Sequence, residues 1–280
     1  MTFRLILVPL EDVRQVAVLA AAAKFARATE AYVEGLDAWS PKHAALLAAD
    51  AAAVAAVPRE GMQAAHRARQ LRSRFEQTMT ASGFVQAERM GQQRAYGWHG
   101  TGLLEDTSIA ERARVFDVTV LARPNADGTS PRVSLVETVL FEAGRPILIV
   151  PTDVPSTFAQ RIMIAWNGST ESARAVAFAM PLLKQAEAVI VLTVAGGMFP
   201  GPSGEDLAAY LAAHDVKVTA ETVPGERSGA GAIFIDEASR RRCDLMVKGA
   251  YTQSRLRQMM FGGVTSQILW QTRIPVLMAH

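Results

Sequence analysis

Arg161-Ile-Met-Ile-Ala-Trp-Asn-Gly168 resembles Arg4-Leu-Ile-Leu-Val-Pro-Leu-Glu11, a stretch that lies 157 residues earlier in the chain. Each stretch is a short apolar run bounded by charged or turn-forming residues. Such a run is typical of a strand that is covered on both faces of a parallel sheet. The recurrence of one buried-strand pattern indicates that the fold is built from two similar halves.

Two further pairs of stretches recur in the same order. Residues 114–121 resemble residues 241–248 at an offset of 127, and residues 144–150 resemble residues 273–279 at an offset of 129. A period near 130 predicts two domains of one fold, 1–153 and 154–280, with a boundary in Pro151-Thr-Asp-Val-Pro-Ser156, a turn-prone linker. The first domain has about 28 extra residues between its first and fourth strands, and this insertion, within region 41–110, has a helical pattern.

Helical patterns alternate with the predicted strands in both halves. In the second half Ser169 is placed to cap a helix, and Ser203 with Asp206 resembles a capping box. Strands that alternate with helices through right-handed crossovers predict an α/β fold of two doubly wound parallel-sheet domains, each with three layers. We expect the segments 146–150 and 275–279 to be neighbours, because their pairing would join the halves as an internal pseudo-two-fold pair and would cover two sheet edges.

Composition excludes several classes of protein. The 280 residues are 50% hydrophobic and 20% charged with a net charge of +2, so neither disorder nor a nucleic-acid-binding surface is expected. The single cysteine, Cys243, forms no internal disulfide, which favours a reducing compartment, and we expect the cytoplasm. The longest apolar stretch, residues 44–57, is too short for a membrane span, and residues 1–9 are better explained as a strand than as a signal segment.

Ligands of open α/β sheets bind beyond the carboxyl ends of the strands, where the winding reverses. In the second half these positions are Ala165-Trp-Asn167-Gly168-Ser169 after the first strand and Gly249 to Thr265 after the fourth. Gly262 and Gly263 lead into a helix whose unpaired amide groups favour an anion. Thr265 adds a hydroxyl in the first helical turn, and Gly249 allows a ligand to approach the backbone.

This arrangement resembles the universal stress protein family in a tandem form, over nearly the whole chain. The resemblance implies a nucleotide α-hydrolase-like or flavodoxin-like fold and the family pattern Gly-x2-Gly-x9-Gly-Ser/Thr, which holds ATP. Gly249 and Gly262 match this pattern, whereas Thr252 and Gly263 replace its second glycine and its Ser/Thr. Asn167 stands where an Asp is expected. Lys248 departs from the usual apolar residue and offers some attraction for a phosphate.

The resemblance implies that ATP or AMP is the ligand of the second half. The expected binding residues are Ala165, Asn167, Gly249, Gly262, Gly263, Val264 and Thr265, with Asn167 near the ribose or base and the glycines, Val264 and Thr265 around the phosphates. The alternative without a ligand is a glycine-rich turn that only connects the fourth strand to the last helix. In the first half no such glycine spacing is present, and Glu11 and Asp12 would repel a phosphate, so no nucleotide is expected there.

No machinery for catalysis or metal binding is visible. The five histidines lack ligand spacing, and no nucleophile elbow or Walker lysine loop is present, so we expect no metal site and no enzyme, with weak ATP hydrolysis as the remaining enzymatic alternative. We expect Cys243 to be a small apolar side chain in the core. The arginines of residues 67–74 are expected to form a solvated helix face, which acidic partners would fit. The resemblance thus implies a stress-response module that senses a nucleotide, and the alternative is a stress-linked interaction scaffold without one. Neither nucleic acid nor a membrane is expected as a partner; a homodimer of chains remains open.

Overall fold

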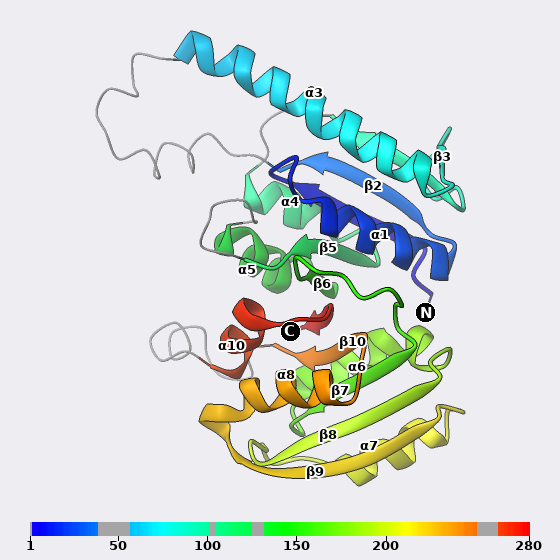
Figure 1. Ribbon diagram of the computed structural model, residues 1–280, viewed down its shortest axis with the longest axis vertical. Coiled ribbons are helices and arrows are strands. Elements are labelled where there is room, and N and C mark those ends of the chain that lie inside the picture. The colour runs from blue at the N-terminus through cyan, green and yellow to red at the C-terminus, as the bar shows by residue number, and fades with distance from the viewer. Residues whose placement is uncertain (1, 39–56, 101–104, 125–131, 251–262) are drawn as a thin grey trace.

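A computed structural model describes residues 2–38, 57–100, 105–124, 132–250 and 263–280. In these residues eleven strands form one sheet in the order β3-β4-β2-β1-β5-β6-β11-β10-β7-β8-β9 (Figure 1). Adjacent strands are parallel everywhere except between β6 and β11. Apart from the short edge strand β3, the two halves place their strands in the same order. Numbered along the chain within each half, this order is third, second, first, fourth and fifth from the outer edge inward. The two fifth strands are neighbours at the centre of the sheet.

The first half alternates strands and helices as predicted. Its elements are β1 (Leu5–Leu10), α1 (Val16–Thr29), β2 (Tyr32–Asp37), α3 (Val57–Ala81), β3 (Val85–Gln86), β4 (Ala95–His99), α4 (Asp106–Ala113), β5 (Val118–Ala122), α5 (Val133–Glu142) and β6 (Ile147–Val150). The helix α3 occupies the crossover between the second and third strands. It is therefore a lengthened version of an element that the second half also has, α7, rather than an addition to the topology.

The second half has the same sequence of elements. They are β7 (Arg161–Trp166), α6 (Thr170–Leu183), β8 (Ala188–Gly196), α7 (Gly204–Ala212), β9 (Val218–Glu226), the 3-10 turn η2 (Arg227–Gly229), α8 (Ala230–Arg240), β10 (Leu245–Gly249), α10 (Val264–Gln271) and β11 (Val276–Ala279). The Ser203–Asp206 capping box is present at the start of α7, and the Ser169 hydroxyl accepts a hydrogen bond from the Ser172 amide at the start of α6.

The two halves are joined through their fifth strands. Leu148 of β6 lies opposite Leu277 of β11 in an antiparallel pair, and Ile149 lies opposite Val276. These side chains are fully buried. The predicted contact between segments 146–150 and 275–279 is therefore confirmed, and the edge that each half would otherwise expose is hydrogen-bonded.

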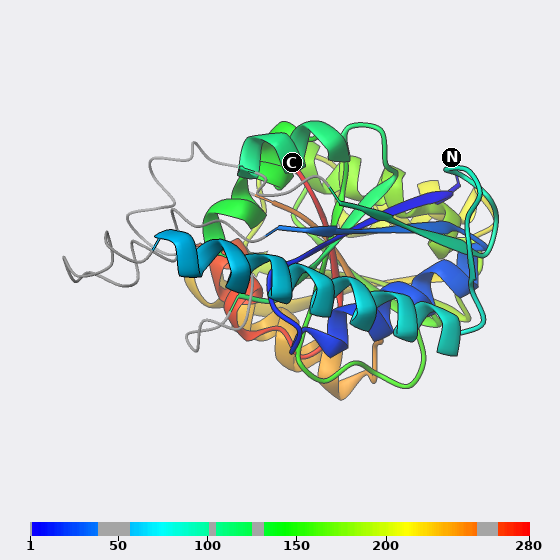
Figure 2. The same cartoon turned by 90° about the horizontal axis from the view of Figure 1, so that it is seen from above.

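Helices cover both faces of the sheet (Figure 2). One buried cluster contains side chains from α1, α3, α6 and α7, and the other contains side chains from α4, α5, α8 and α10. Because side chains alternate between the faces of a strand, each central strand supplies both clusters, and its sequence is apolar throughout. The result is the predicted three-layer α/β architecture.

One pair of aspartates fixes how the two halves correspond. Asp117 accepts hydrogen bonds from the amides of Arg4 and Leu5 at 2.7 and 2.9 Å, and Asp244 accepts them from Gln160 and Arg161 at 3.1 and 2.9 Å. Leu5 therefore corresponds to Arg161, whereas the resemblance of the two sequences predicts that Arg4 corresponds to Arg161. The structural offset is 156 residues at the first strand, so the partner of Asn167 in the first half is Glu11.

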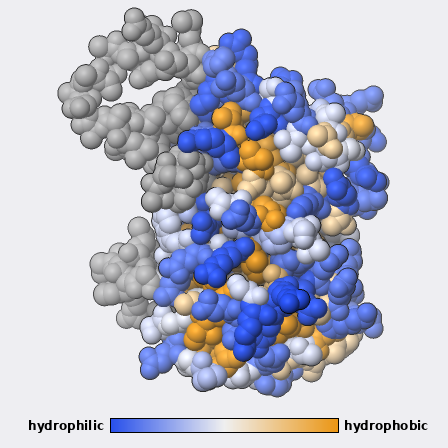
Figure 3. All heavy atoms as spheres, in the orientation of Figure 1, coloured by the Kyte–Doolittle hydropathy of each residue, from blue (hydrophilic) through white to orange (hydrophobic). Residues whose placement is uncertain are grey.

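The surface gives no indication of a membrane-spanning element. None of the helices in the described residues is long and apolar enough to cross a bilayer. The face drawn in Figure 3 is largely hydrophilic, with apolar side chains in scattered groups. Much of the predicted insertion, residues 41–56, lies outside the described residues, as do the predicted site residue Gly262 and Thr252, which replaces the second glycine of the family pattern.

Candidate functional site

The predicted site lies where two neighbouring strands of the second half end. Strand β7 pairs with β10 in parallel, with Ala165 opposite Lys248, so the loops that follow both strands leave the sheet at the same edge. The helix α6 begins on one face of the sheet and α10 on the other. This edge is the position at which open α/β sheets bind ligands.

Asn167 follows β7 and shapes the start of α6. Its side-chain oxygen accepts a hydrogen bond from the Ser172 hydroxyl at 2.8 Å and another from the Ser169 amide at 3.2 Å. The oxygen that we expected to face a ligand is thus used within the turn. The amide nitrogen has no hydrogen bond to a described residue, so Asn167 offers a ligand a donor rather than an acceptor.

Gly249 ends β10 and is required for packing against α6. A Cβ atom at this position would lie 2.3 Å from the Ser172 nitrogen and 2.6 Å from the carbonyl carbon of Glu171. Both are backbone atoms of the first turn of α6, which cannot move aside without shifting the helix. The predicted role, close approach of a ligand, is replaced here by close approach of a helix.

Lys248, which precedes this glycine, is the most unusual side chain of the region. It is only 6% exposed, and its Nζ atom donates hydrogen bonds to the Thr265 hydroxyl at 2.9 Å and to the Gly249 carbonyl at 2.6 Å. Burial lowers the pKa of Lys248 to about 7, because the charged ammonium loses its hydration. Lys248 was absent from the predicted set of binding residues, although a lysine at the end of an apolar strand was a visible signal.

The start of α10 has the form of an anion-binding turn. Gly263 is its N-cap residue in an extended conformation, no side chain caps the helix, and the first helical bond runs from the Gln267 amide to the Gly263 carbonyl at 3.0 Å. Among the described residues, no partner accepts a hydrogen bond from the amides of Gly263 or Val264. Such amides at the positive end of a helix attract negative charge.

Trp166 does not fill this region. Its indole nitrogen donates to the Pro202 carbonyl at 2.9 Å, and the ring is buried in the cluster on the α6 and α7 side of the sheet. Ala165, one residue earlier, points to the opposite face, where α10 lies. The indole is therefore a core side chain and is separated by the sheet from the start of α10.

Comparisons with known proteins agree with this architecture. The model of the universal stress protein family matches residues 159–280. Residues 159–280 form a universal stress protein domain. A search of curated protein sequences finds no match.

Solved structures extend the likeness to the whole chain. A universal stress protein from Archaeoglobus fulgidus DSM 4304 is 14% identical, with a TM-score of 0.70 over 99% of this chain and 97% of that chain. A protein assigned to the universal stress proteins, from Pseudomonas aeruginosa UCBPP-PA14, has a TM-score of 0.52 at 14% identity, over 99% and 93%. The cytoplasmic domain of a prokaryotic cation chloride cotransporter has a TM-score of 0.50 at 12% identity, over 99% and 95%. At these identities the likeness shows the fold, in which residues 1–150 share the strand order of the universal stress protein domain.

The first half differs from the universal stress protein domain at the corresponding edge. Glu11, the counterpart of Asn167, accepts a hydrogen bond from the backbone amide of Arg132 at 2.9 Å and is ion-paired with its guanidinium. Arg132 is the N-cap residue of α5, and its guanidinium also binds Asp106 and the Ala38 carbonyl. A carboxylate of the chain itself therefore lies at the start of this helix.

The guanidinium of Arg132 is held firmly in this network. Its side chain is 5% exposed, and burial lowers its pKa to about 10, which leaves it charged at neutral pH. The two carboxylates compensate for the charge that burial would otherwise penalise. Internal ion pairs thus occupy this edge of the first half. At the corresponding position of the universal stress protein domain, the start of α10, the described residues form no ion pair.

Proposed function

We propose that the universal stress protein domain, residues 159–280, binds an adenine nucleotide, ATP or AMP, with its phosphates at the first turn of α10. The observation that supports this most directly is the contrast between the two halves. The helix after the fourth strand of the first half receives the Glu11 carboxylate, whereas no described carboxylate is hydrogen-bonded to the start of α10. A position that takes an internal anion in one half is suited to an external anion in the other.

The binding residues have distinct tasks in this proposal. The amides of Gly263 and Val264 donate to phosphate oxygens, and Thr265, whose hydroxyl oxygen accepts a hydrogen bond from Lys248, lies beside them in the first helical turn. Lys248 supplies positive charge from behind the helix start. The amide nitrogen of Asn167 faces the sugar or the base, and the Ala165 backbone borders the site. Gly262 precedes the helix in the sequence and matches the third glycine of the family pattern.

The preference for adenine rests on the resemblance to the family and not on a contact in the structure. We propose that binding serves a stress response in the cytoplasm and that it acts by biasing contacts with a partner protein, not by catalysis.

Calorimetric titration with ATP and AMP tests the proposal on a pair of variants at one position. Gly263→Asp places a carboxylate at the N-cap of α10, where it stabilises the helix but repels a phosphate. Gly263→Ser adds an uncharged cap and restores the residue type of the family pattern. We expect saturable binding by the unchanged protein, equal or tighter binding by Gly263→Ser, and at least tenfold weaker binding by Gly263→Asp.

Two results would count against the proposal. Absence of any binding heat at millimolar nucleotide would refute nucleotide binding, and equal affinities in both variants would refute the position. Urea unfolding of the two variants provides the control, because both caps are expected to preserve or raise stability.

The second candidate is an interaction scaffold that binds no nucleotide. It is favoured by the internal use of the predicted ligand groups: the Asn167 oxygen shapes α6, and the Thr265 hydroxyl is bound by Lys248. The same titration separates the two functions.

A further inference from the structure

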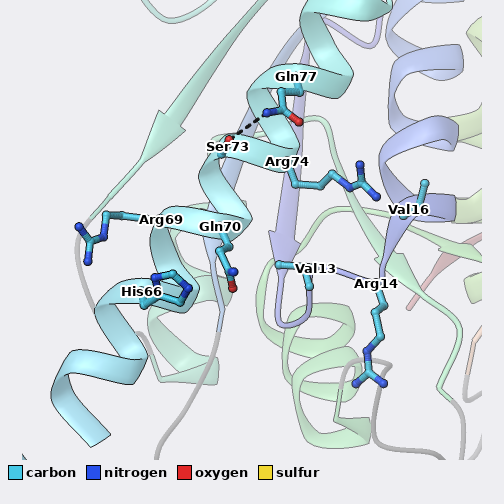
Figure 4. A pocket seen from close by; sticks show the side chains of 9 residues that line it. All are labelled: Val13, Arg14, Val16, His66, Arg69, Gln70, Ser73, Arg74 and Gln77. Atoms are coloured by element: carbon cyan, nitrogen blue, oxygen red, sulfur yellow. Dashed lines mark hydrogen bonds between the residues drawn. The ribbon is translucent and has the colours of Figure 1, made fainter. Parts of the chain in front are cut away.

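A groove of about 780 Å³ lies in the first half, between α3 and the segment that connects β1 to α1 (Figure 4). Residues 66–77 of α3 form one wall, and Val13, Arg14 and Val16 form the other. The groove is distinct from the edge proposed to bind nucleotide, which belongs to the second half. It follows from the lengthening of α3, because the counterpart α7 has nine residues and bears Glu205 and Asp206 in its first turn.

The cationic side chains of the α3 wall lack acidic partners. Arg74 forms no ion pair with a described residue, and Arg69 bonds only the Ala65 carbonyl of its own helix at 3.3 Å. Arginines on the other faces of α3 are paired: Arg67 with Asp37 at 3.1 Å and Arg72 with Glu76 at 2.8 Å. Among the described side chains of α3, the arginines outside the groove are thus ion-paired and those that line it are not.

The remaining groups of the groove fit a peptide. Figure 4 shows Arg74 extending from α3 toward Val16 and Gln70 pointing into the gap, while Arg69 extends from the other side of α3. Gln70 and Gln77 offer amides that match the donors and acceptors of a peptide backbone. Val16 is a large apolar side chain with 43% exposure, which gives the opposite wall an apolar contact surface.

We propose that this groove binds an extended acidic segment of a partner protein. The stripe from His66 to Gln77 covers twelve residues, and its ends are roughly 16 Å apart along the helix axis, which equals about five residues of extended chain. Acidic side chains of that segment pair with Arg69 and Arg74, and an apolar side chain between them contacts Val16. A nucleic acid fits less well, because the lining has no Phe, Tyr or Trp side chain for base stacking and the whole chain has a net charge of only +2.

The test measures binding of a fluorescein-labelled peptide of alternating glutamate and leucine to the full chain by fluorescence anisotropy. A peptide with glutamine in place of glutamate and a single-stranded DNA oligonucleotide are measured in parallel. Arg69→Gln/Arg74→Gln removes the two unpaired charges. Arg72→Gln/Arg89→Gln removes the same charge from exposed positions outside the groove and is the matched control.

We expect saturable binding of the acidic peptide that weakens about tenfold in Arg69→Gln/Arg74→Gln and less than twofold in the control variant. The glutamine peptide is expected to bind at least tenfold more weakly than the acidic one. The proposal is overturned by no binding at 100 µM protein, by equal losses in both variants, or by a DNA affinity that exceeds the peptide affinity. Circular dichroism and urea unfolding verify that both variants remain folded.

Discussion

Replacing Lys248 by methionine removes a buried amine while it retains most of the side-chain volume. The lysine has a pKa of about 7 in the folded chain, against 10.5 for an unburied lysine. Between these two values the unfolded chain binds a proton that the folded chain does not bind. The stability of the unchanged protein therefore rises with pH in this window, whereas Lys248→Met has no such contribution.

The size of the effect follows from the two pKa values. A pKa difference corresponds to about 1.4 kcal/mol per unit, and the folded state is half protonated at pH 7, so the unchanged protein gains roughly 2 kcal/mol between pH 7 and pH 9. Between pH 6 and pH 7 the gain is only a few tenths of a kcal/mol, because Lys248 is then largely protonated in both states. The methionine variant is expected to be the more stable protein at pH 6, and its advantage should decrease by roughly 2 kcal/mol from pH 7 to pH 9.

Urea unfolding at pH 6, 7, 8 and 9 in a buffer without phosphate measures these free energies. Lys217→Met, which changes an exposed lysine just before β9, controls for the general effect of pH on stability, and its difference from the unchanged protein should stay constant. If the advantage of Lys248→Met is the same at pH 7 and pH 9 within a few tenths of a kcal/mol, the amine keeps its proton at both pH values and the reasoning is refuted.

Four further outcomes are expected. Gly249→Ala should lower the free energy of unfolding by roughly 2–4 kcal/mol, because its Cβ would lie 2.3 Å from the Ser172 nitrogen, and urea unfolding measures the loss. Arg132→Met should cost about 3 kcal/mol in the same assay, since two partly buried carboxylates lose their cation. The Cys243 thiol, which is buried with a pKa raised to about 11, should react with maleimide only after unfolding. ATP affinity should fall roughly tenfold from pH 7 to pH 9 and should lose this dependence in Lys248→Met, which calorimetry at the two pH values measures.

The order of elements was predictable because each strand of this fold is a short apolar run between turn signals. The recurrence of residues 114–121 and 241–248 placed the fourth strands correctly, and the expected contact between the fifth strands is present. These features depend on the burial of whole segments, and the apolar or polar type of the residues predicts that burial directly. Their prediction did not require knowledge of any single contact.

The register of the first strands was predicted one residue away from the correct one. Matching Arg4 with Arg161 aligned two arginines, but the hydrogen bonds of Asp117 and Asp244 align Leu5 with Arg161. An apolar run resembles itself after a shift of one residue. Its residue types therefore do not determine which residue of the first half corresponds to which residue of the second. The shift matters because it assigns every side chain of the strand to the opposite face of the sheet. It also makes Glu11, not Leu10, the counterpart of Asn167.

The roles of Gly249 and Lys248 depend on contacts between segments that are distant in the sequence. The contact of Gly249 with α6 joins residues 77 positions apart, and the bond from Lys248 to Thr265 spans 17. A glycine at the end of a strand is compatible with a ligand or with a helix beside it, and only the fold decides between them. The position of Gly263 at the start of α10, by contrast, followed from local sequence alone.

The two halves provide different charges at the same edge, and this difference predicts the character of nucleotide binding. The Glu11 carboxylate in the first half is held by an amide and by a guanidinium that stays charged at neutral pH. A phosphate at α10 is offered amides, a hydroxyl and an amine that is half protonated at pH 7, so its attraction is weaker and depends on pH. A phosphate that binds beside Lys248 favours the protonated amine and raises its pKa, which links nucleotide binding to proton uptake. Calorimetry at pH 7.5 in buffers of different ionisation enthalpy would therefore detect the uptake of up to one proton per nucleotide, and an uptake that is unchanged in Lys248→Met would place the phosphates away from this amine.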